Sequence, residues 1–172
     1  KTHKDWIKMN KILPDILNSG KDKDTAITIP DKEKINYLEL KHLVKDTSEK
    51  LVSFGTQKEK PIVIVLRNNA EFIISFLSVT NTSAIAAPLN PEFTEEEFDF
   101  YLDDINPSMV ITSEGHSVIK KAEEKNIPVS IVSFNNGSLK MDFNSKEITE
   151  KNSTSPNENN SCLFLHTSGT TS

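Results

Sequence analysis

Residues 61–90 read PIVIVLRNNAEFIISFLSVTNTSAIAAPLN, and this stretch decides the fold class. It opens at 61–66 with a continuous, mostly β-branched run, which is typical of a strand buried on both faces of a parallel sheet. A second apolar run follows at 84–89. Between them a helix is expected at 70–80, with a face predicted to carry Ile73, Phe76, Leu77 and Thr80. Strand, helix and strand in this order predict a βαβ unit.

The same alternation continues downstream. Apolar runs at 109–112 and 128–133 predict two more strands, and Val118, Ile119 and Ala122 mark a helix between them. Strands that recur about every 20 residues, with a helix between each pair, indicate a parallel sheet. The fold class is therefore α/β, with a parallel-sheet subdomain built from βαβ units.

Two helix starts carry capping boxes, in which a polar residue precedes a Glu by three positions. Asn36 with Glu39 opens a helix expected at 37–54. Thr94 with Glu97 opens another, whose apolar positions follow at i, i+3, i+4 and i+7: Phe98, Tyr101, Leu102 and Ile105.

We divide the chain into four parts. Residues 1–24 are Lys-rich, and we expect a short amphipathic helix there, with a basic surface patch as the alternative. Residues 25–134 form the α/β sheet subdomain. Residues 135–161 are rich in Asn, Ser, Lys and Glu, which predicts a solvated connection. Residues 162–172 read as a strand running into a turn.

Composition excludes several classes of protein. The 172 residues include 20 Lys+Arg and 25 Asp+Glu, a net charge of −5, and Arg67 is the one Arg. Such a chain is a poor reader of DNA, where Arg makes the main base contacts. The longest apolar-rich run is far shorter than the roughly 20 residues that a membrane span needs. The single Cys162 excludes an internal disulfide and fits a reducing, intracellular compartment.

Both ends of the chain suggest a fragment. Position 1 is Lys rather than Met, and no apolar signal-peptide core follows. The apolar run 162–166 leads directly into a Ser/Gly/Thr turn. We therefore expect the amino-terminal part of a longer protein.

The strongest candidate site is the turn that follows the run 162–166. Its Gly permits a tight bend that exposes backbone N–H groups, and the surrounding hydroxyls can join them in holding phosphate oxygens. On residue types alone, an ordinary Ser/Gly/Thr turn is the favoured interpretation, because such turns are common. The candidate residues are Thr167, Ser168, Gly169, Thr170, Thr171 and Ser172.

Acidic residues elsewhere are predicted to be structural. Those between 95 and 104 fall on the helix face opposite Phe98 and Leu102, so a solvated face explains them better than a metal site. Asp22 and Asp24, with Thr25 directly after them, look similar to the D-x-D-x-T motif of aspartate-based phosphotransferases, but they follow Gly20 in a Lys-rich segment rather than a buried strand.

The remaining candidates are single residues. His166 adjoins the Ser/Thr turn, and an orienting or packing role is favoured over a general base. Cys162 is expected to be a packed thiol. Arg67 and Asn69 follow the strand 61–66 at the edge where parallel sheets bind ligands, although helix capping is the simpler role for Asn69. His42 is expected at the surface.

Four blocks of sequence together resemble one family. They are LFLHTSGTTS at 163–172, YLEL at 37–40, LRNNAEF at 66–72, and APLNP at 87–91 with TEEE and YL after it. Taken in their order along the chain, they are similar to the adenylate-forming superfamily of acyl-CoA synthetases, luciferases and peptide-synthetase adenylation domains. The resemblance covers roughly residues 35–112 and 162–172, and it favours the phosphate-binding interpretation of the turn.

The resemblance implies an ATP-dependent carboxylate–CoA ligase that forms an acyl-adenylate and then a thioester. ATP, Mg²⁺ and CoA are the implied cofactors and substrates, with a small carboxylate as the acid, and residues 167–172 are the implied ATP-phosphate loop. It implies no catalytic residue and no metal ligand within these 172 residues, which alone are expected to be inactive. After Ser172, we expect one intervening residue and then a Pro-Lys pair.

His166 and Ser172 depart from the commoner Tyr or Phe and Gly, and the block resembles the fungal and plant oxalate–CoA ligase branch. That branch implies a peroxisomal location, with the cytoplasm as the alternative. Two other functions stay open: another adenylating branch, such as a fatty acyl-CoA ligase, or an α/β binding module that has lost catalysis.

Overall fold

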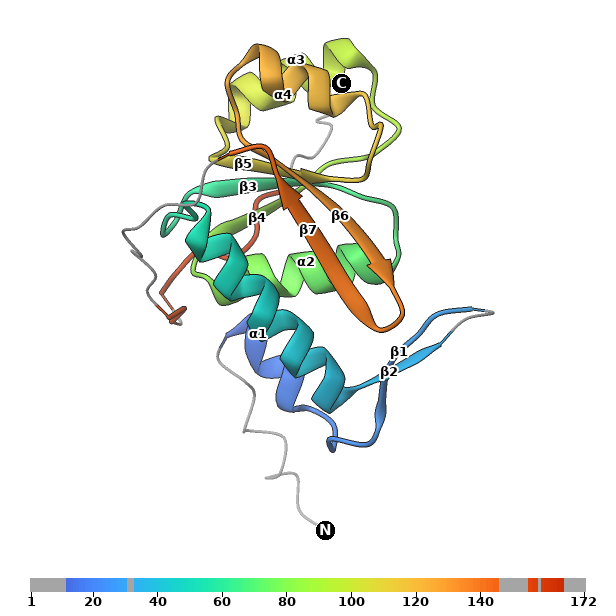
Figure 1. Ribbon diagram of the computed structural model, residues 1–172. Helices are drawn as coiled ribbons and strands as arrows, with labels where there is room; N and C mark the ends of the chain where they lie inside the picture. Colours follow the sequence, from blue (N-terminus) through green and yellow to red (C-terminus); the bar gives the residue numbers. More distant parts are fainter. Residues whose placement is uncertain (1–11, 31–32, 146–154, 158, 166–172) are drawn as a thin grey trace, which may run out of the picture.

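The computed structural model describes residues 12–30, 33–145, 155–157 and 159–165. Its centre is a five-stranded sheet in the order β4-β3-β5-β6-β7, in which β7 alone is antiparallel to its neighbour (Figure 1). The mostly parallel sheet confirms the predicted fold class. The strands are β3 (Pro61–Val65), β4 (Ile85–Pro88), β5 (Met109–Thr112), β6 (Val129–Asn135) and β7 (Ser138–Phe143).

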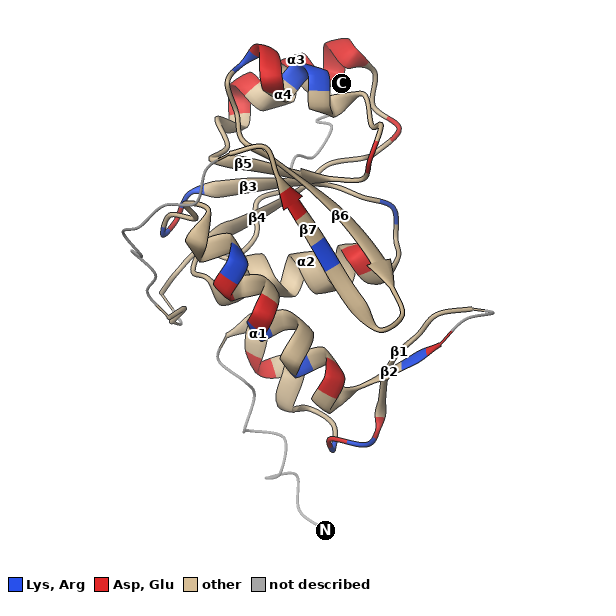
Figure 2. Cartoon of the chain, viewed as in Figure 1, with Lys and Arg blue, Asp and Glu red and all other residues tan. Residues whose placement is uncertain are grey.

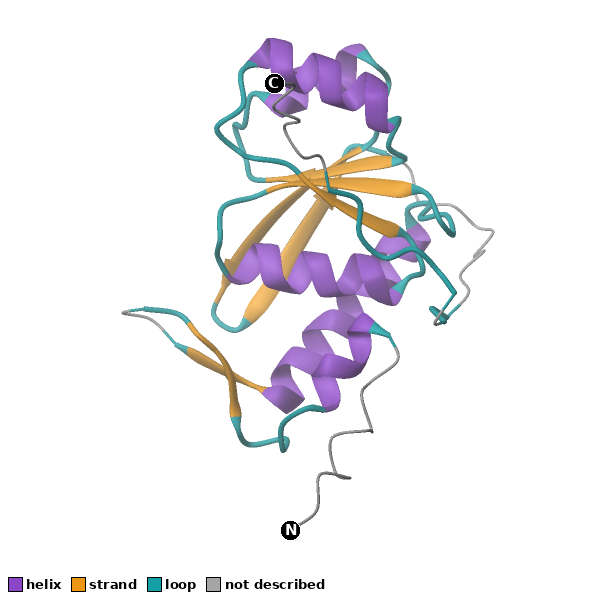
Figure 3. Ribbon diagram, turned by 180° about the vertical axis from the view of Figure 1, so that it is seen from behind, coloured by secondary structure: helices purple, strands orange, loops and turns teal. Residues whose placement is uncertain are grey.

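Helices cover both faces of this sheet (Figure 3). From β3 the chain steps outward to β4 through α2 (Ala70–Asn81), then back across β3 to β5 through α3 (Glu95–Ile105). Right-handed crossovers in opposite directions place these helices on opposite faces. Helix α1 (Tyr37–Ser53) packs beside α2, and α4 (Val118–Glu124) packs beside α3.

The core lies on both faces of β3, as its sequence predicts. Ile62 and Ile64 belong to the cluster under α1 and α2, while Val63 and Val65 belong to the cluster under α3 and α4. All four are fully buried. The two capping boxes are also confirmed.

The face predicted for α2 needs a correction. Ile73 is 37% exposed, whereas its neighbour Ile74 is fully buried. Leu77 and Thr80 are buried as expected, and Phe76 is half-buried. The helix is apolar on most of its circumference, so residue spacing could not select its inner face.

The prediction of a solvated connection over 135–161 is wrong in its first part. Strand β6 runs to Asn135, and a tight turn leads into β7, which pairs with β6 along its whole length. Asn136 and Gly137 have positive φ angles of 50° and 70°, typical of the two-residue turn in a β-hairpin.

The amino-terminal region differs from the helix expected at 1–24. From residue 12 it forms a short 3₁₀ helix, η1 (Leu13–Asn18), with Pro14 at its first turn, and residues 1–11 lie outside the described ranges. A separate antiparallel pair follows, β1 (Thr25–Thr28) and β2 (Lys34–Asn36), which projects from the body (Figure 1). In the described ranges, no helix is both long and apolar enough to cross a membrane.

Candidate functional site

The predicted phosphate-binding residues lie outside the described residues, and so does His166. These residues are Thr167, Ser168, Gly169, Thr170, Thr171 and Ser172. The segment that leads to them is described as far as Leu165. Leu163 forms a parallel bridge with Ala86 of β4. The Ala86 N–H donates to the Cys162 carbonyl oxygen at 3.0 Å, and the Phe164 N–H donates to the Ala86 carbonyl oxygen at 2.9 Å.

This bridge fixes the direction of the segment 162–165. Because the pairing is parallel, the segment runs the same way as β4, toward the edge where β3, β4 and β5 all end. The expected strand at 162–166 is therefore present as a single-residue bridge within its described part. Its position brings the chain to the carboxyl edge of the sheet.

A crevice of about 340 Å³ opens at this edge between the ends of β3 and β5. The chain leaves β3 toward β4 and later returns to β5 on the other side, so this is the point where strand order reverses. Open α/β sheets bind ligands at such points. Arg67, which the sequence placed at this edge, lines the crevice with Glu92, Ser113 and Ser117, which sequence reasoning missed.

Arg67 and Glu92 form an ion pair at the mouth of the crevice. The Arg67 guanidinium Nη2 donates to Glu92 Oε1 at 3.0 Å, and the two side chains are 80% and 69% exposed. Exposed pairs of this kind contribute at most about 1 kcal/mol. A ligand with a negative group could therefore compete with Glu92 for the guanidinium at little cost.

His116 ties together two loops that border the crevice. Its Nε2 lies 3.0 Å from the carbonyl oxygen of Pro91, which can only accept, so Nε2 carries the proton. Its Nδ1 accepts the Val118 N–H at 3.2 Å. The ring also meets Phe98 edge-on, with centroids 5.5 Å apart. Both ring nitrogens are thus used in holding the two loops together.

Asn69 has the capping role that the sequence favoured for it. Its Oδ1 accepts the Phe72 N–H at 3.0 Å and begins α2. Asp22 and Asp24 are also structural: Asp22 pairs with Lys41 at 2.8 Å, and Asp24 accepts the Lys21 N–H in an exposed turn. His42 is exposed on α1, as predicted.

The acidic residues of α3 form a charged seam with α4 (Figure 2). Lys125 contacts Asp103 at 2.6 Å and Asp99 at 3.0 Å, and Lys120 contacts Glu95 at 3.2 Å. The hydrogen bonds that the Lys125 ammonium donates to Asp103 and then to Asp99 raise its pKa above the ordinary value. Within the described ranges, no three His, Cys, Asp or Glu side chains form a group suited to a metal ion.

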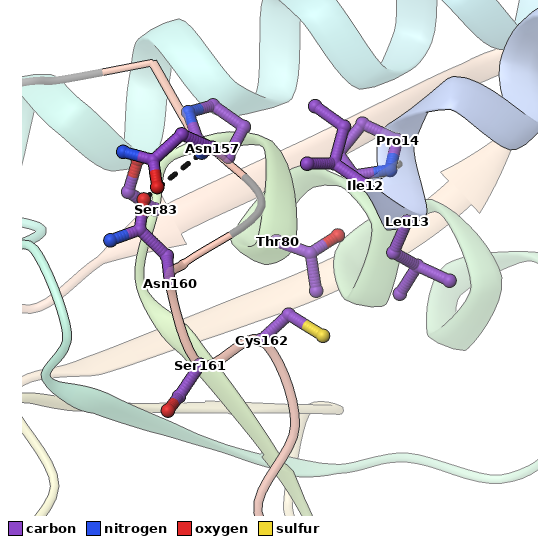
Figure 4. Close-up of a pocket in the computed structure, with 10 residues that line it drawn as sticks. Ile12, Leu13, Pro14, Thr80, Ser83, Asn157, Asn160, Ser161 and Cys162 are labelled. Carbon is purple, nitrogen blue, oxygen red and sulfur yellow. Dashed lines mark hydrogen bonds between the residues drawn. The ribbon is translucent and has the colours of Figure 1, made fainter. Parts of the chain in front are cut away.

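Cys162 is half-buried and lines a small cavity of about 160 Å³ behind β4 (Figure 4). Leu13 and Pro14 of η1, Thr80 of α2 and Asn160 also line it. The sulfur lies on the side of Leu13 and Thr80 in Figure 4, so the thiol sits among side chains from three segments. This placement agrees with the packed thiol that the sequence predicted.

Comparison with known proteins gives the family. Residues 18–172 match the model of the AMP-binding enzyme family, so the chain belongs to that family. It is 30% identical over 154 residues to an oxalate–CoA ligase of Arabidopsis thaliana, which covers 86% of this chain and 30% of that protein. It is 32% identical over 110 residues to a long-chain-fatty-acid–CoA ligase of Bacillus subtilis, covering 60% of this chain and 19% of that protein.

Solved structures agree with the fold. ATP-bound MatB from Rhodopseudomonas palustris superposes with a TM-score of 0.64 at 23% identity, over 72% of this chain and 25% of that one. The chain therefore spans about 30% of the length of the Arabidopsis relative and about a quarter of MatB.

Proposed function

We propose that the whole protein is an AMP-forming acid–CoA ligase, and that residues 167–172 bind the phosphates of ATP. The parallel bridge between Leu163 and Ala86 carries the proposal, because it brings the chain to the carboxyl edge immediately before these residues. Membership of the AMP-binding enzyme family and the relatives named as CoA ligases support it.

The reaction has two steps. A carboxylate oxygen attacks the α-phosphorus of ATP, and the bond to the pyrophosphate oxygen breaks, which gives an acyl-adenylate and pyrophosphate. The sulfur of CoA then attacks the acyl carbonyl and AMP leaves, while the thiol proton passes to solvent. A carboxylate substrate is already ionised near neutral pH, so the first step needs no base from this chain.

The loop acts on the charge of the leaving pyrophosphate. Backbone N–H groups around Gly169 and the hydroxyls of Thr170 and Thr171 would hold the β- and γ-phosphate oxygens. Mg²⁺ prefers oxygen ligands of the kind that hydroxyls and phosphates supply, and when bound it would screen the phosphate charge.

The experiment for this proposal is a double substitution in the whole protein. Thr170→Val with Thr171→Val removes two hydroxyls and keeps the side-chain shape. We expect pyrophosphate release to fall about 100-fold or more. Thr25→Val, at the exposed first residue of β1 and far from 170 in the sequence, is the matched control and should leave the rate unchanged. Undiminished turnover by the double variant would refute the loop assignment.

Oxalate is the acid that we propose as substrate, because the oxalate–CoA ligase of Arabidopsis thaliana is 30% identical over most of this chain. A panel of oxalate, longer dicarboxylates and fatty acids, read by pyrophosphate release from the whole protein, tests this. Oxalate should give the highest kcat/KM, whereas preference for a long-chain acid would favour the fatty acyl branch. We also propose a peroxisomal location, which a fluorescent fusion of the whole protein would test.

A further inference from the structure

Three exposed asparagines share one backbone conformation and differ in the residue that follows them. Asn106, Asn126 and Asn136 have φ angles of 48°, 56° and 50°, which lie in the left-handed region, and all three residues are exposed. The next residue is a proline, an isoleucine and a glycine, respectively. The three positions therefore form an internal comparison of how the following residue affects the chemistry of the asparagine side chain.

An asparagine can react with its own backbone when the nitrogen of the next residue reaches its side-chain carbonyl carbon. The nitrogen attacks Cγ and a C–N bond forms. The side-chain amide nitrogen leaves as ammonia, which carries away the proton of the attacking nitrogen. Water then opens the resulting cyclic imide at either of its carbonyl carbons, which gives aspartate or isoaspartate.

The following residue decides which of the three asparagines can react. Asn106 cannot react in this way, because the proline after it has no N–H. Asn126 precedes an isoleucine, whose β-branched side chain crowds the attacking nitrogen. Gly137 has an N–H and no side chain. Among the described residues, a Cβ placed on Gly137 would meet one atom beyond its chain neighbours within 4 Å, Glu33 Oε2 at 3.8 Å, so the surroundings of the Asn136–Gly137 pair are open.

The same turn also holds a distant part of the chain. The Gly137 N–H donates to Glu33 Oε1 at 3.4 Å. Glu33 lies immediately before β2, and its carbonyl oxygen accepts the Ile29 N–H, just after β1, at 2.9 Å. The turn between β6 and β7 is thus joined to the adjacent end of the β1–β2 pair through an exposed hydrogen bond.

We propose that Asn136 is a modification site, at which the side-chain amide is converted to aspartate and isoaspartate, and that this conversion detaches Glu33 from the β6–β7 turn. The imide has no N–H at position 137, so the hydrogen bond to Glu33 is lost. After water opens the ring, a new carboxylate beside that position repels the carboxylate of Glu33. In isoaspartate the backbone also passes through the side-chain carbon, which lengthens a turn whose geometry fits two residues.

Peptide mapping of the whole protein by mass spectrometry, during incubation at neutral pH, tests the site. Conversion at Asn136 should exceed that at Asn126 by about tenfold or more, and Asn106 should keep its amide. Asn136→Gly is the matched variant, because a Gly-Gly pair suits the same turn and has no side-chain amide to lose. Equal conversion at Asn136 and Asn126 in the unmodified protein would overturn the proposal.

Hydrogen exchange of the whole protein tests the consequence of the conversion. The Ile29 amide, which bonds to Glu33, should exchange about tenfold faster once Asn136 has been converted, because the end of the β1–β2 pair is then released. Asn136→Gly protein kept for the same time should show no such increase. Constant exchange at Ile29 as the conversion proceeds, or an equal increase in the variant, would refute the proposed detachment.

Discussion

The two faces of the sheet are covered in different ways. On one face, α1 and α2 touch through small polar side chains: Ser78 Oγ donates to the carbonyl oxygen of Ile74 at 2.7 Å and lies 3.3 Å from that of Val44 on α1. On the other face, the ring of Phe98 fills the space under α3 and meets Phe93 and His116 edge-on. On one face, two helices approach each other closely because the side chains between them are small. On the other face, the helices pack over one large apolar side chain, Phe98, which acts as the anchor of that face.

Charge follows the same division. Lys125, directly after α4, bridges to Asp99 and Asp103 of α3, whereas no ion pair among the described residues joins α1 to α2. Both loops tied by His116 belong to the α3/α4 face, and they border the crevice at the carboxyl edge. The difference teaches that the α1/α2 face restricts side-chain size, while the α3/α4 face combines a large buried aromatic ring with exposed ion pairs.

The largest effect is expected from Phe98→Ala, which empties the anchor of the α3/α4 face. Phe98 is fully buried, and such truncations cost about 3–5 kcal/mol of unfolding free energy. Phe100→Ala, two positions along the same helix and 63% exposed, should change it by no more than about 0.5 kcal/mol. Urea denaturation of both variants measures the contrast, and similar losses would show that Phe98 is not the anchor.

A smaller effect is expected on the α1/α2 face, where substitutions of Ser78 test whether the close approach of α1 and α2 needs a small residue. Ser78→Leu forces a branched side chain between the two helices and should cost about 1–3 kcal/mol. Ser78→Ala keeps the helices close and loses the hydroxyl alone, at about 1 kcal/mol or less. If denaturation shows that leucine is tolerated as well as alanine, the helices do not need a small residue at this contact.

Helix caps should contribute equally on both faces, because they act locally. Thr94 caps α3 and Asn69 caps α2, each through one side-chain oxygen that accepts a backbone N–H. Thr94→Ala and Asn69→Ala are each expected to cost about 1 kcal/mol by denaturation. If Asn69→Ala alone lowered the unfolding free energy by well above about 2 kcal/mol, the main role of Asn69 would be to stabilise the carboxyl edge of the sheet rather than to cap α2.

The interior of the fold was predictable because its pattern is periodic and local. The β-branched run of β3 and the helical spacing around Phe98 each specify an element and its buried face. The β7 strand was missed because residues 135–161 are polar on average, which hid the alternation of Leu139 and Met141. The Asn136–Gly137 pair was a recognisable hairpin signal within that stretch.

The candidate site was less predictable for a different reason. Arg67 follows β3 directly, so its position at the carboxyl edge could be anticipated. Glu92 and Ser113 join it through strand order, which periodicity does not specify. His116 looked unremarkable because its two partners, Pro91 and Val118, are backbone groups that any residue supplies. The phosphate-loop assignment of residues 167–172 remains a prediction.

The smallest effect concerns the exposed ion pairs that Lys125 forms with Asp99 and Asp103 on the α3/α4 face. Hydrogen bonds to Asp103 and Asp99 raise the folded-state pKa of Lys125 above 10.5. A raised pKa means that the contribution of Lys125 to stability is complete below the unfolded-state pKa and is lost as the pH rises through the folded-state value. The Tm difference between the unmodified protein and Lys125→Met should therefore be constant from about pH 7 to 9 and be lost as the pH rises through the raised folded-state pKa. Because the pair is exposed, added salt should also reduce this difference. A difference that fell instead between about pH 7 and 9, where lysine stays charged, would show that the seam does not act through the ammonium group.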